Sequence, residues 1–304
     1  MIDNQKDDKI DKKEDRLIRA ITTDRQIRAI AATTTGVVEK SRQLHNTSPL
    51  ATSALGRALT GALMIASLLK SGKEVSLTIT GDGPLDKIVA EADLYGKVRG
   101  YVKNPDANLP LNDSGKIAVG KGIGQGKLIV RKDLGLKEPY QGQVPLISGE
   151  IGEDITYYFT KSEQTPSSVG VGVLVSPEMT VAAAGGFLIQ LFPEAEEKAI
   201  TTLEKNINRI SSVTEMISEG MEPEAILNQI LEGLDFKVLE SKEVQYDCRC
   251  SRERVLSLIR GLDPEDIKKT LAEQGKVEIG CQFCNQTYLF TDADIAELDL
   301  EGNS

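Results

Sequence analysis

The chain has 304 residues, of which 40% are hydrophobic and 27% charged, a composition typical of globular proteins and unlike that of disordered or fibrous ones. At about 150 residues per domain, this length predicts two domains. Lysine and arginine number 36 and aspartate and glutamate 46, and the net charge of −10 argues against general binding to nucleic acids or anionic membranes. His45 is the single histidine, which excludes chemistry that needs two or more histidines.

The first segment of the chain is dominated by charge. Residues 1–16 carry five basic and six acidic side chains and too few apolar ones to form a core, so we expect a disordered extension. The segment also lacks the apolar centre of a secretory signal. The longest uncharged apolar stretch of the first half, residues 58–69, has 12 residues, fewer than the roughly 18–20 that cross a bilayer. We therefore expect a soluble, cytoplasmic protein with no membrane partner.

Residues 17–192 are predicted to form an α+β core domain of mixed sheet and helix. Ser48 and Pro49 are typical of a helix start, and an alanine-rich helix is expected to follow as far as Leu69. Residues 150–161 indicate a second helix. Strands are predicted at residues 74–80, 127–131, 143–147, 168–175 and 181–191. Because helices and strands do not alternate as regular βαβ units, the pattern favours α+β over a parallel α/β fold.

Residues 193–244 have almost no strand signal and are predicted to form a helical linker. Apolar residues recur there every three or four positions, the spacing of amphipathic helices. The two apolar stripes comprise Ile200, Leu203, Ile207 and Ile210, and then Ile226, Leu227, Ile230, Leu231 and Leu234. Two interpretations remain open at this point: the stripes pack permanently on the core domain, or they can be released. Sequence alone favours permanent packing.

Residues 245–304 form a third unit that carries all four cysteines. Cys248 and Cys250 make a C-x-C pair, Cys281 and Cys284 a C-x-x-C pair, and 30 residues separate the pairs. Two such pairs supply the four sulfurs of a tetrahedral zinc site, and in a reducing cytosol they favour a metal over structural disulfides. We therefore expect one Zn²⁺ per chain, with an iron–sulfur centre or redox-only thiols as the alternatives. Four sulfur ligands leave no position for a catalytic water.

A metal in so small a unit suggests a switch. Metal binding contributes on the order of 10–16 kcal/mol of folding free energy to a small site, so metal loss should unfold the unit. The close sulfurs of the C-x-C pair are poised to oxidise once the metal leaves. The expected sequence of events is oxidation, zinc loss, unfolding and release of the acidic helical segment. The aromatic residues near the cysteines are expected to pack around the metal: Tyr246, Phe283, Tyr288 and Phe290.

The chain resembles the redox-regulated 33-kDa heat-shock chaperone family, which are bacterial holdases. The type and spacing of the cysteine pairs match the zinc switch of that family. Further matches are His45 with Ser48-Pro49, residues 54–57, residues 148–150 with Asp154, residues 162–166, and residues 185–187. The resemblance extends from about Leu17 to Leu300 and leaves the charged leader outside it.

The resemblance implies a mechanism. The reduced, zinc-bound protein is expected to be inactive, and oxidation is expected to form the disulfides Cys248–Cys250 and Cys281–Cys284 and to release zinc. The activated protein, expected to dimerise, would then hold unfolding client proteins without ATP during oxidative and heat stress. The expected client contacts lie on the linker stripes: Ile200, Leu203, Ile207, Ile226, Ile230 and Leu234.

Other functions fit the sequence less well, and we expect no enzymatic activity. A zinc-ribbon module that binds a partner without redox switching is the main alternative. A nucleic-acid ribbon should be basic, whereas residues 245–304 carry 7 basic and 12 acidic side chains, a net charge of 7 − 12 = −5. A thiol–disulfide oxidoreductase would place Cys281 and Cys284 near a βαβ pattern, which is missing from the sequence. Residues 115–122 nearly fit a phosphate-binding loop, but Gly122 stands where Ser or Thr must hold Mg²⁺, so no nucleotide is expected.

Overall fold

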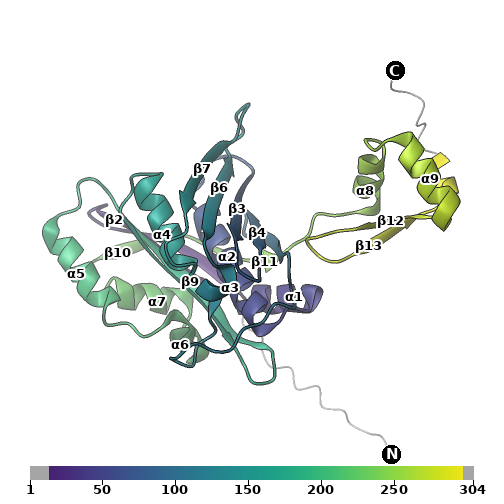
Figure 1. Cartoon of the computed structure of the whole chain (residues 1–304). Coiled ribbons are helices and arrows are strands. Elements are labelled where there is room, and N and C mark those ends of the chain that lie inside the picture. Colours follow the sequence, from purple (N-terminus) through teal and green to yellow (C-terminus); the bar gives the residue numbers. More distant parts are fainter. Residues whose placement is uncertain (1–13, 297–304) are drawn as a thin grey trace, which may run out of the picture. The chain divides into compact units, whose positions relative to one another are not determined.

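The structure is a computed structural model that describes residues 14–296 (Figure 1). The chain divides into two compact units, a large one that ends at Tyr246 and a small one that begins at Asp247. Each unit combines helices and strands, and the predicted α+β fold class is confirmed. Within residues 14–296, no helix combines the length and the apolar character needed to cross a membrane.

The large unit contains two sheets. Sheet A is antiparallel, with the strand order β10-β1-β2-β9-β8. Its strands are β1 (Arg16–Thr22), β2 (Ile27–Thr33), β8 (Ser167–Val175), β9 (Val181–Leu191) and β10 (Phe236–Glu243). Sheet B has the order β11-β5-β4-β3-β6-β7, and only its β11–β5 pair is parallel. Its strands are β3 (Glu74–Gly81), β4 (Lys87–Asp93), β5 (Lys97–Val102), β6 (Gly126–Asp133), β7 (Tyr140–Pro145) and β11 (Gln245–Tyr246).

The predicted central helix, α2 (Pro49–Ala66), packs against strands of both sheets. Ser48 begins it as expected, because its Oγ accepts a hydrogen bond from the backbone N–H of Ala51 at 3.1 Å. All but two residues of α2 are buried, and its small side chains permit this close packing. A Cβ atom on Gly61, for example, would lie 2.5 Å from Cδ1 of Ile155 on α4 (Gly152–Lys161). The main core therefore lies around α2.

Residues 148–150 with Asp154, one of the stretches that resemble the chaperone family, have a structural role in the large unit. The fully buried carboxylate of Asp154 accepts hydrogen bonds from the backbone N–H groups of Ile147 (2.8 Å) and Ile151 (3.0 Å). It thereby fixes the loop before α4, in which Glu150 reaches Arg57 of α2 at 2.5 Å. This stretch stabilises the fold of the large unit.

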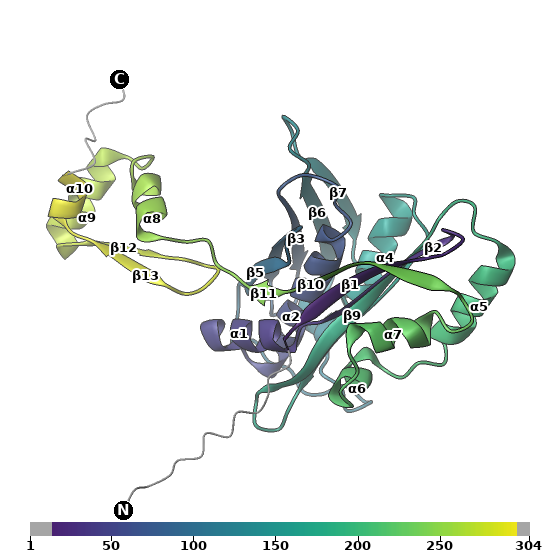
Figure 2. The same cartoon turned by 180° about the vertical axis from the view of Figure 1, so that it is seen from behind.

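Three short helices cover the face of sheet A opposite to α2. They are α5 (Glu197–Ile207), α6 (Val213–Ser218) and α7 (Pro223–Ile230), and we call them the helical cover (Figure 2). Ile18 on β1 contacts this cover, whereas the adjacent Leu17 faces α2, as the alternation of a strand requires. The helical cover and the face of sheet A beneath it form a second apolar core of the large unit. Five of the predicted client contacts belong to this core: Leu203, Ile207, Ile226, Ile230 and Leu234. The sixth, Ile200, is partly exposed.

The end of the predicted helical linker is a strand, so the prediction was wrong for this stretch. Strand β10 pairs with β1 from Thr22 opposite Phe236 to Arg16 opposite Glu243. Its side chains are largely exposed because it forms the edge of sheet A, so no apolar alternation marks it in the sequence. Backbone hydrogen bonds to a distant partner determine its conformation.

The charged leader ends earlier than predicted. Residues 1–13 lie outside the described part of the chain, but Arg16 begins β1, and Asp15 is partly buried. The carboxylate of Asp15 accepts a hydrogen bond at 2.7 Å from the backbone N–H of Val37, in the first turn of α1 (Thr35–His45). The expectation of disorder was therefore wrong for Asp15 and Arg16, because a tertiary contact that the local composition does not reveal holds them.

Candidate metal centre

The small unit is built around a β-hairpin and three helices. Strands β12 (Val277–Gly280) and β13 (Thr287–Phe290) pair in antiparallel fashion, and the helices are α8 (Arg252–Ile259), α9 (Pro264–Gln274) and α10 (Asp292–Ala296). Its buried apolar core comprises Val255, Ile259, Ile267, Val277, Phe290 and Ile295. A core of this size supplies little folding free energy, so a further stabilising element is required.

Two turns present the four cysteines. Cys248 and Cys250 lie just before α8, whose N-cap Ser251 accepts a hydrogen bond from the N–H of Arg254 at 3.2 Å. Cys281 and Cys284 lie in the turn between β12 and β13. The backbone C=O of Cys281 accepts a hydrogen bond from the N–H of Asn285 at 2.8 Å, and Asn285 has a φ of +56°, in the left-handed region. The turn therefore directs both sulfurs to the same side of the hairpin.

The structure brings all four predicted ligands together. Their Sγ atoms lie within 4.8 Å of one another. Cys248 and Cys281 are 3.6 Å apart, and Cys250 and Cys284 are 3.3 Å apart. Four sulfurs at about 2.3 Å from a tetrahedral zinc ion would be about 3.8 Å apart. The observed separations, from 3.3 Å to no more than 4.8 Å, span a range that includes this value.

Electrostatics also favour a cation at this position. Burial is the main cause that raises the pKa of Cys248 and of Cys284, so these thiols resist ionisation on their own. Metal ligation requires thiolates, and four negative sulfurs so close together need a positive charge between them. The donor set therefore suits a divalent, sulfur-seeking ion such as zinc.

Tyr288 on β13 contacts the cluster in a way that the spacing of the cysteines does not reveal. Its hydroxyl donates a hydrogen bond to Sγ of Cys250 at 3.1 Å. Burial acts to raise the pKa of Cys250, but the hydrogen bonds from Tyr288 and the neighbouring thiols outweigh it and lower this pKa. The sequence placed Tyr288 near the metal without a specific role, and the structure assigns it a hydrogen bond to one ligand.

The other aromatic residues differ in position. Phe290 lies in the core of the small unit, with the guanidinium carbon of Arg252 4.5 Å from its ring centre. Phe283 is partly exposed in the turn between the last two cysteines. Tyr246 belongs to the large unit, where its hydroxyl donates to the C=O of Gly100 at 2.9 Å, so the expectation that it packs around the metal was wrong. Closeness in sequence was misleading because the boundary between the units follows Tyr246.

Comparisons with known proteins agree with the fold. A family model described as "Hsp33 protein" matches residues 15–291. A 33 kDa chaperonin of Geobacillus sp. (strain WCH70) is 47% identical over 285 residues, which are 93% of this chain and 97% of the relative. A 33 kDa chaperonin of Desulforamulus reducens is 44% identical over 285 residues, 94% of this chain and 97% of that protein.

A solved structure gives the same result. The crystal structure of the 33 kDa chaperonin (HSP33) of Thermotoga maritima superposes with a TM-score of 0.88 at 39% sequence identity. The match covers 95% of this chain and 98% of that one, so it includes both compact units.

Proposed function

Because the chain belongs to the Hsp33 family, we propose that it is a redox-regulated, ATP-independent chaperone that holds unfolding proteins in the cytoplasm. Family membership supports the chaperone function itself. The regulatory part of the proposal depends on one observation: four cysteine sulfurs lie within 4.8 Å of one another in a unit whose own apolar core is small.

The cysteine cluster is proposed as the sensor. When bound, zinc holds the four thiolates together and contributes on the order of 10–16 kcal/mol to folding of the small unit. Peroxide would oxidise each pair of cysteines, Cys248 with Cys250 and Cys281 with Cys284. As each disulfide forms, its pair of thiolates gives two electrons to one peroxide molecule, which takes up two protons from the solvent and becomes two waters. Sulfurs joined in disulfides can no longer serve as thiolate ligands, so the small unit loses its main stabilisation.

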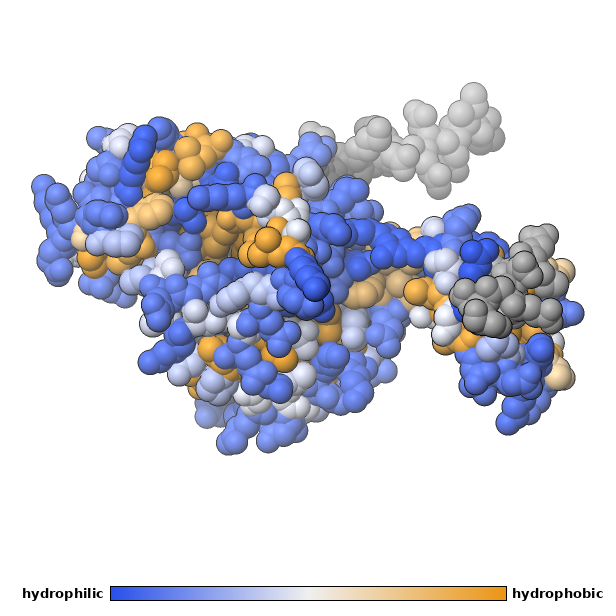
Figure 3. Space-filling view, turned by 90° about the horizontal axis from the view of Figure 1, so that it is seen from above, coloured by the Kyte–Doolittle hydropathy of each residue, from blue (hydrophilic) through white to orange (hydrophobic). Residues whose placement is uncertain are grey.

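The client-binding surface is proposed on the large unit. The helical cover shields an apolar face of sheet A that includes Ile18, Ile27 and Ile189. Figure 3 shows only separated apolar patches among hydrophilic side chains on the face that it displays. Release of the cover would expose both this face and the predicted client contacts, and the activated protein would dimerise. The reduced form, with the cover packed, would be inactive.

The test is light scattering from a thermally unfolding client protein. Zinc-loaded reduced protein should leave aggregation unchanged, whereas peroxide-treated protein at mild heat should suppress it, with zinc appearing in a colorimetric assay. Peptide mapping should find the disulfides Cys248–Cys250 and Cys281–Cys284; a Cys248–Cys281 bond would overturn the pairing. The double substitution Ile207→Ser and Ile230→Ser should weaken holding at unchanged zinc content.

The second candidate is a zinc module that binds a protein partner without redox switching. The same four sulfurs and the net charge of 7 − 12 = −5 on residues 245–304 favour a protein over a nucleic acid as that partner. If neither redox form suppresses aggregation, this candidate replaces the chaperone switch. Turnover of insulin disulfides should be absent in both cases, because the proposal includes no enzymatic activity, no nucleotide and no membrane partner.

A further inference from the structure

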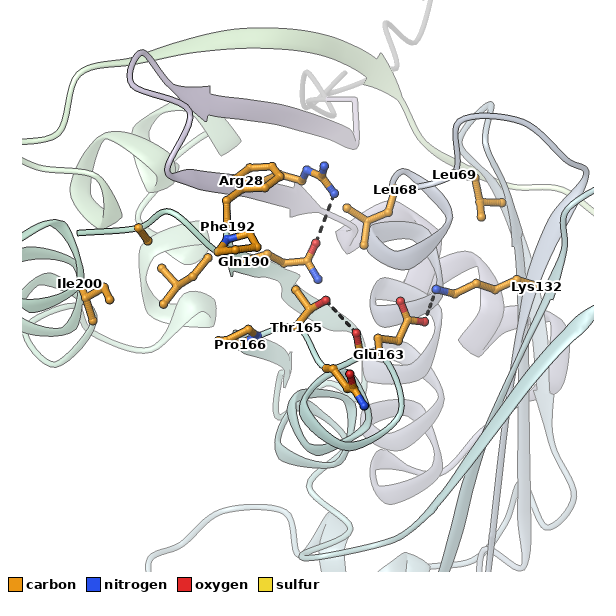
Figure 4. A pocket seen from close by; sticks show the side chains of 14 residues that line it. Arg28, Leu68, Leu69, Lys132, Glu163, Thr165, Pro166, Gln190, Phe192 and Ile200 are labelled. Carbon is orange, nitrogen blue, oxygen red and sulfur yellow. Dashed lines mark hydrogen bonds and ion pairs between the residues drawn. The ribbon is translucent and has the colours of Figure 1, made fainter. Parts of the chain in front are cut away.

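A cavity of about 560 Å³ opens on the large unit, far along the chain from the cysteines. Its walls come from β2, β6 and β9, from the loops that follow α2 and α4, and from the beginning of the segment that carries α5. Figure 4 shows Arg28 and Gln190 directed toward each other, Lys132 paired with Glu163, and Leu68, Leu69 and Ile200 around the same space. Its volume falls within the range of about 300–1,000 Å³ that is typical of small-molecule sites.

Arg28 is the unusual residue of this cavity. Its guanidinium lies 5.1 Å from the ring centre of Phe192, and its Nη1 reaches Oε1 of Gln190 only at 3.4 Å. Among residues 14–296, no carboxylate forms an ion pair with Arg28. Burial, and secondarily the nearby charge of Arg19, lower the pKa of Arg28, which shows that the cation is held in an unfavourable environment. A partly buried cation with no anionic partner costs free energy, and a bound anion would recover it.

The second cation of the cavity is already neutralised. Lys132 forms an ion pair with Glu163, and the hydroxyl of Tyr158 also donates to this carboxylate, at 2.5 Å. The charged residues of the lining are Arg28, Lys132 and Glu163, so its net charge is +1. Much of the remaining wall is apolar and is formed by Leu68, Leu69, Pro166, Leu191, Phe192, Pro193, Ala195 and Ile200.

We propose that this cavity binds a small monocarboxylate with an aliphatic or aromatic body. The planar guanidinium of Arg28 pairs with the carboxylate, whose two oxygens match its fork of N–H donors. Leu68, Leu69 and Ile200 pack against the apolar body. One available cation beside apolar walls suits a monoanion better than a phosphate, which carries more charge and needs more donors. The site shares no residue with the cysteine cluster, but Ile200 lies on α5 of the helical cover, so the cavity is complete only in the reduced form, in which the cover is packed.

The test measures binding of 4-phenylbutyrate to the full-length, reduced, zinc-loaded protein by calorimetry, with the neutral 4-phenylbutan-1-ol as the matched ligand. Arg28→Met removes the charge and keeps the length of the side chain. Arg131→Met is the control, because Arg131 is exposed on β6 and its loss changes the net charge equally. A charge-assisted hydrogen bond is worth about 1.5–3 kcal/mol. The dissociation constant should therefore rise at least tenfold in Arg28→Met and stay unchanged in Arg131→Met, and the alcohol should bind at least tenfold more weakly.

Three results would overturn the proposal: no binding of phenylbutyrate at millimolar concentration, equal binding of the alcohol, or equal binding by Arg28→Met. The Arg28→Met protein should still fold, since the substitution breaks no ion pair and leaves an apolar side chain in a partly apolar wall. If it fails to fold, Ile200→Glu decides the matter. This substitution places a negative charge at the cavity wall on a partly exposed helical position, and it should weaken phenylbutyrate binding; unchanged binding would refute the site.

Discussion

Asn206 joins two helices of the helical cover, and its replacement by alanine is expected to loosen that cover. The side chain is only 5% exposed, and its Nδ2 donates hydrogen bonds to the C=O groups of Ile230 at 3.0 Å and Glu232 at 2.8 Å. Asn206→Ala would leave both carbonyl groups without this donor. At about 1–2 kcal/mol for each, the cover should lose about 2–4 kcal/mol of stability, whereas a whole domain has about 5–15 kcal/mol.

Hydrogen exchange of the reduced, zinc-loaded protein measures this loss directly. A change of 2 kcal/mol corresponds to about a thirtyfold change in an equilibrium constant, so amides of α7 should exchange at least about thirtyfold faster in Asn206→Ala. Asn208→Ala is the control, because Asn208 is exposed at the end of α5. The variant should also suppress client aggregation at a lower peroxide dose. Exchange in α7 that stays within threefold of the unsubstituted protein would refute the reasoning.

Three further predictions concern the cysteine cluster and the charged leader. The zinc-bound sulfur of Cys250 is a thiolate with or without Tyr288, and the hydrogen bond from Tyr288 withdraws charge from it. Tyr288→Phe should therefore make this sulfur react faster with peroxide, by up to about tenfold in a zinc-release assay, while Tyr95→Phe, at a residue 74% exposed, should change nothing. Metal removal by a chelator under reducing conditions should make the chain protease-sensitive from Asp247 onward; a small unit that stays compact without metal would contradict this. Burial raises the pKa of Asp15 from 3.8 to about 6, so the folded state binds the proton of this carboxyl more tightly than the unfolded state does. As pH rises from about 4 to 6, the free energy of unfolding should therefore fall by on the order of 3 kcal/mol. The difference in melting temperature between Asp15→Asn and the unsubstituted protein should therefore change across that pH range, and a constant difference would show that Asp15 does not titrate as argued.

Features with a local cause could be predicted from the sequence. The N-cap at Ser48 and the small residues after it specify a helix without reference to any partner, and α2 is present as predicted. The cysteine spacing was equally informative, because ligands two or three residues apart must share a turn. All four sulfurs accordingly meet in one cluster.

Features with a distant cause could not be predicted. The conformation of β10 depends on β1, more than 200 residues earlier in the chain, and its exposed side chains leave no periodic signal. Asp15 is ordered by the start of α1, and Asn206 holds carbonyl groups at the end of α7 and just after it. The bond from Tyr288 to Cys250 depends on how the hairpin meets the C-x-C turn. In each case the partner is defined only by the completed fold.

The strand order of sheet A also determines when this protein can complete its fold during synthesis. Strand β1 leaves the ribosome first, but its partner β10 begins 236 − 22 = 214 residues after β1 ends. At about 5–20 residues per second, roughly 11–43 s pass between the two. During that interval one edge of β1 has no strand to pair with, and until α5, α6 and α7 have been made, the apolar face that they later shield is open. A protein proposed to hold the unfolded chains of others therefore passes through its own aggregation-prone stage on the ribosome, before α5, α6 and α7 have been made.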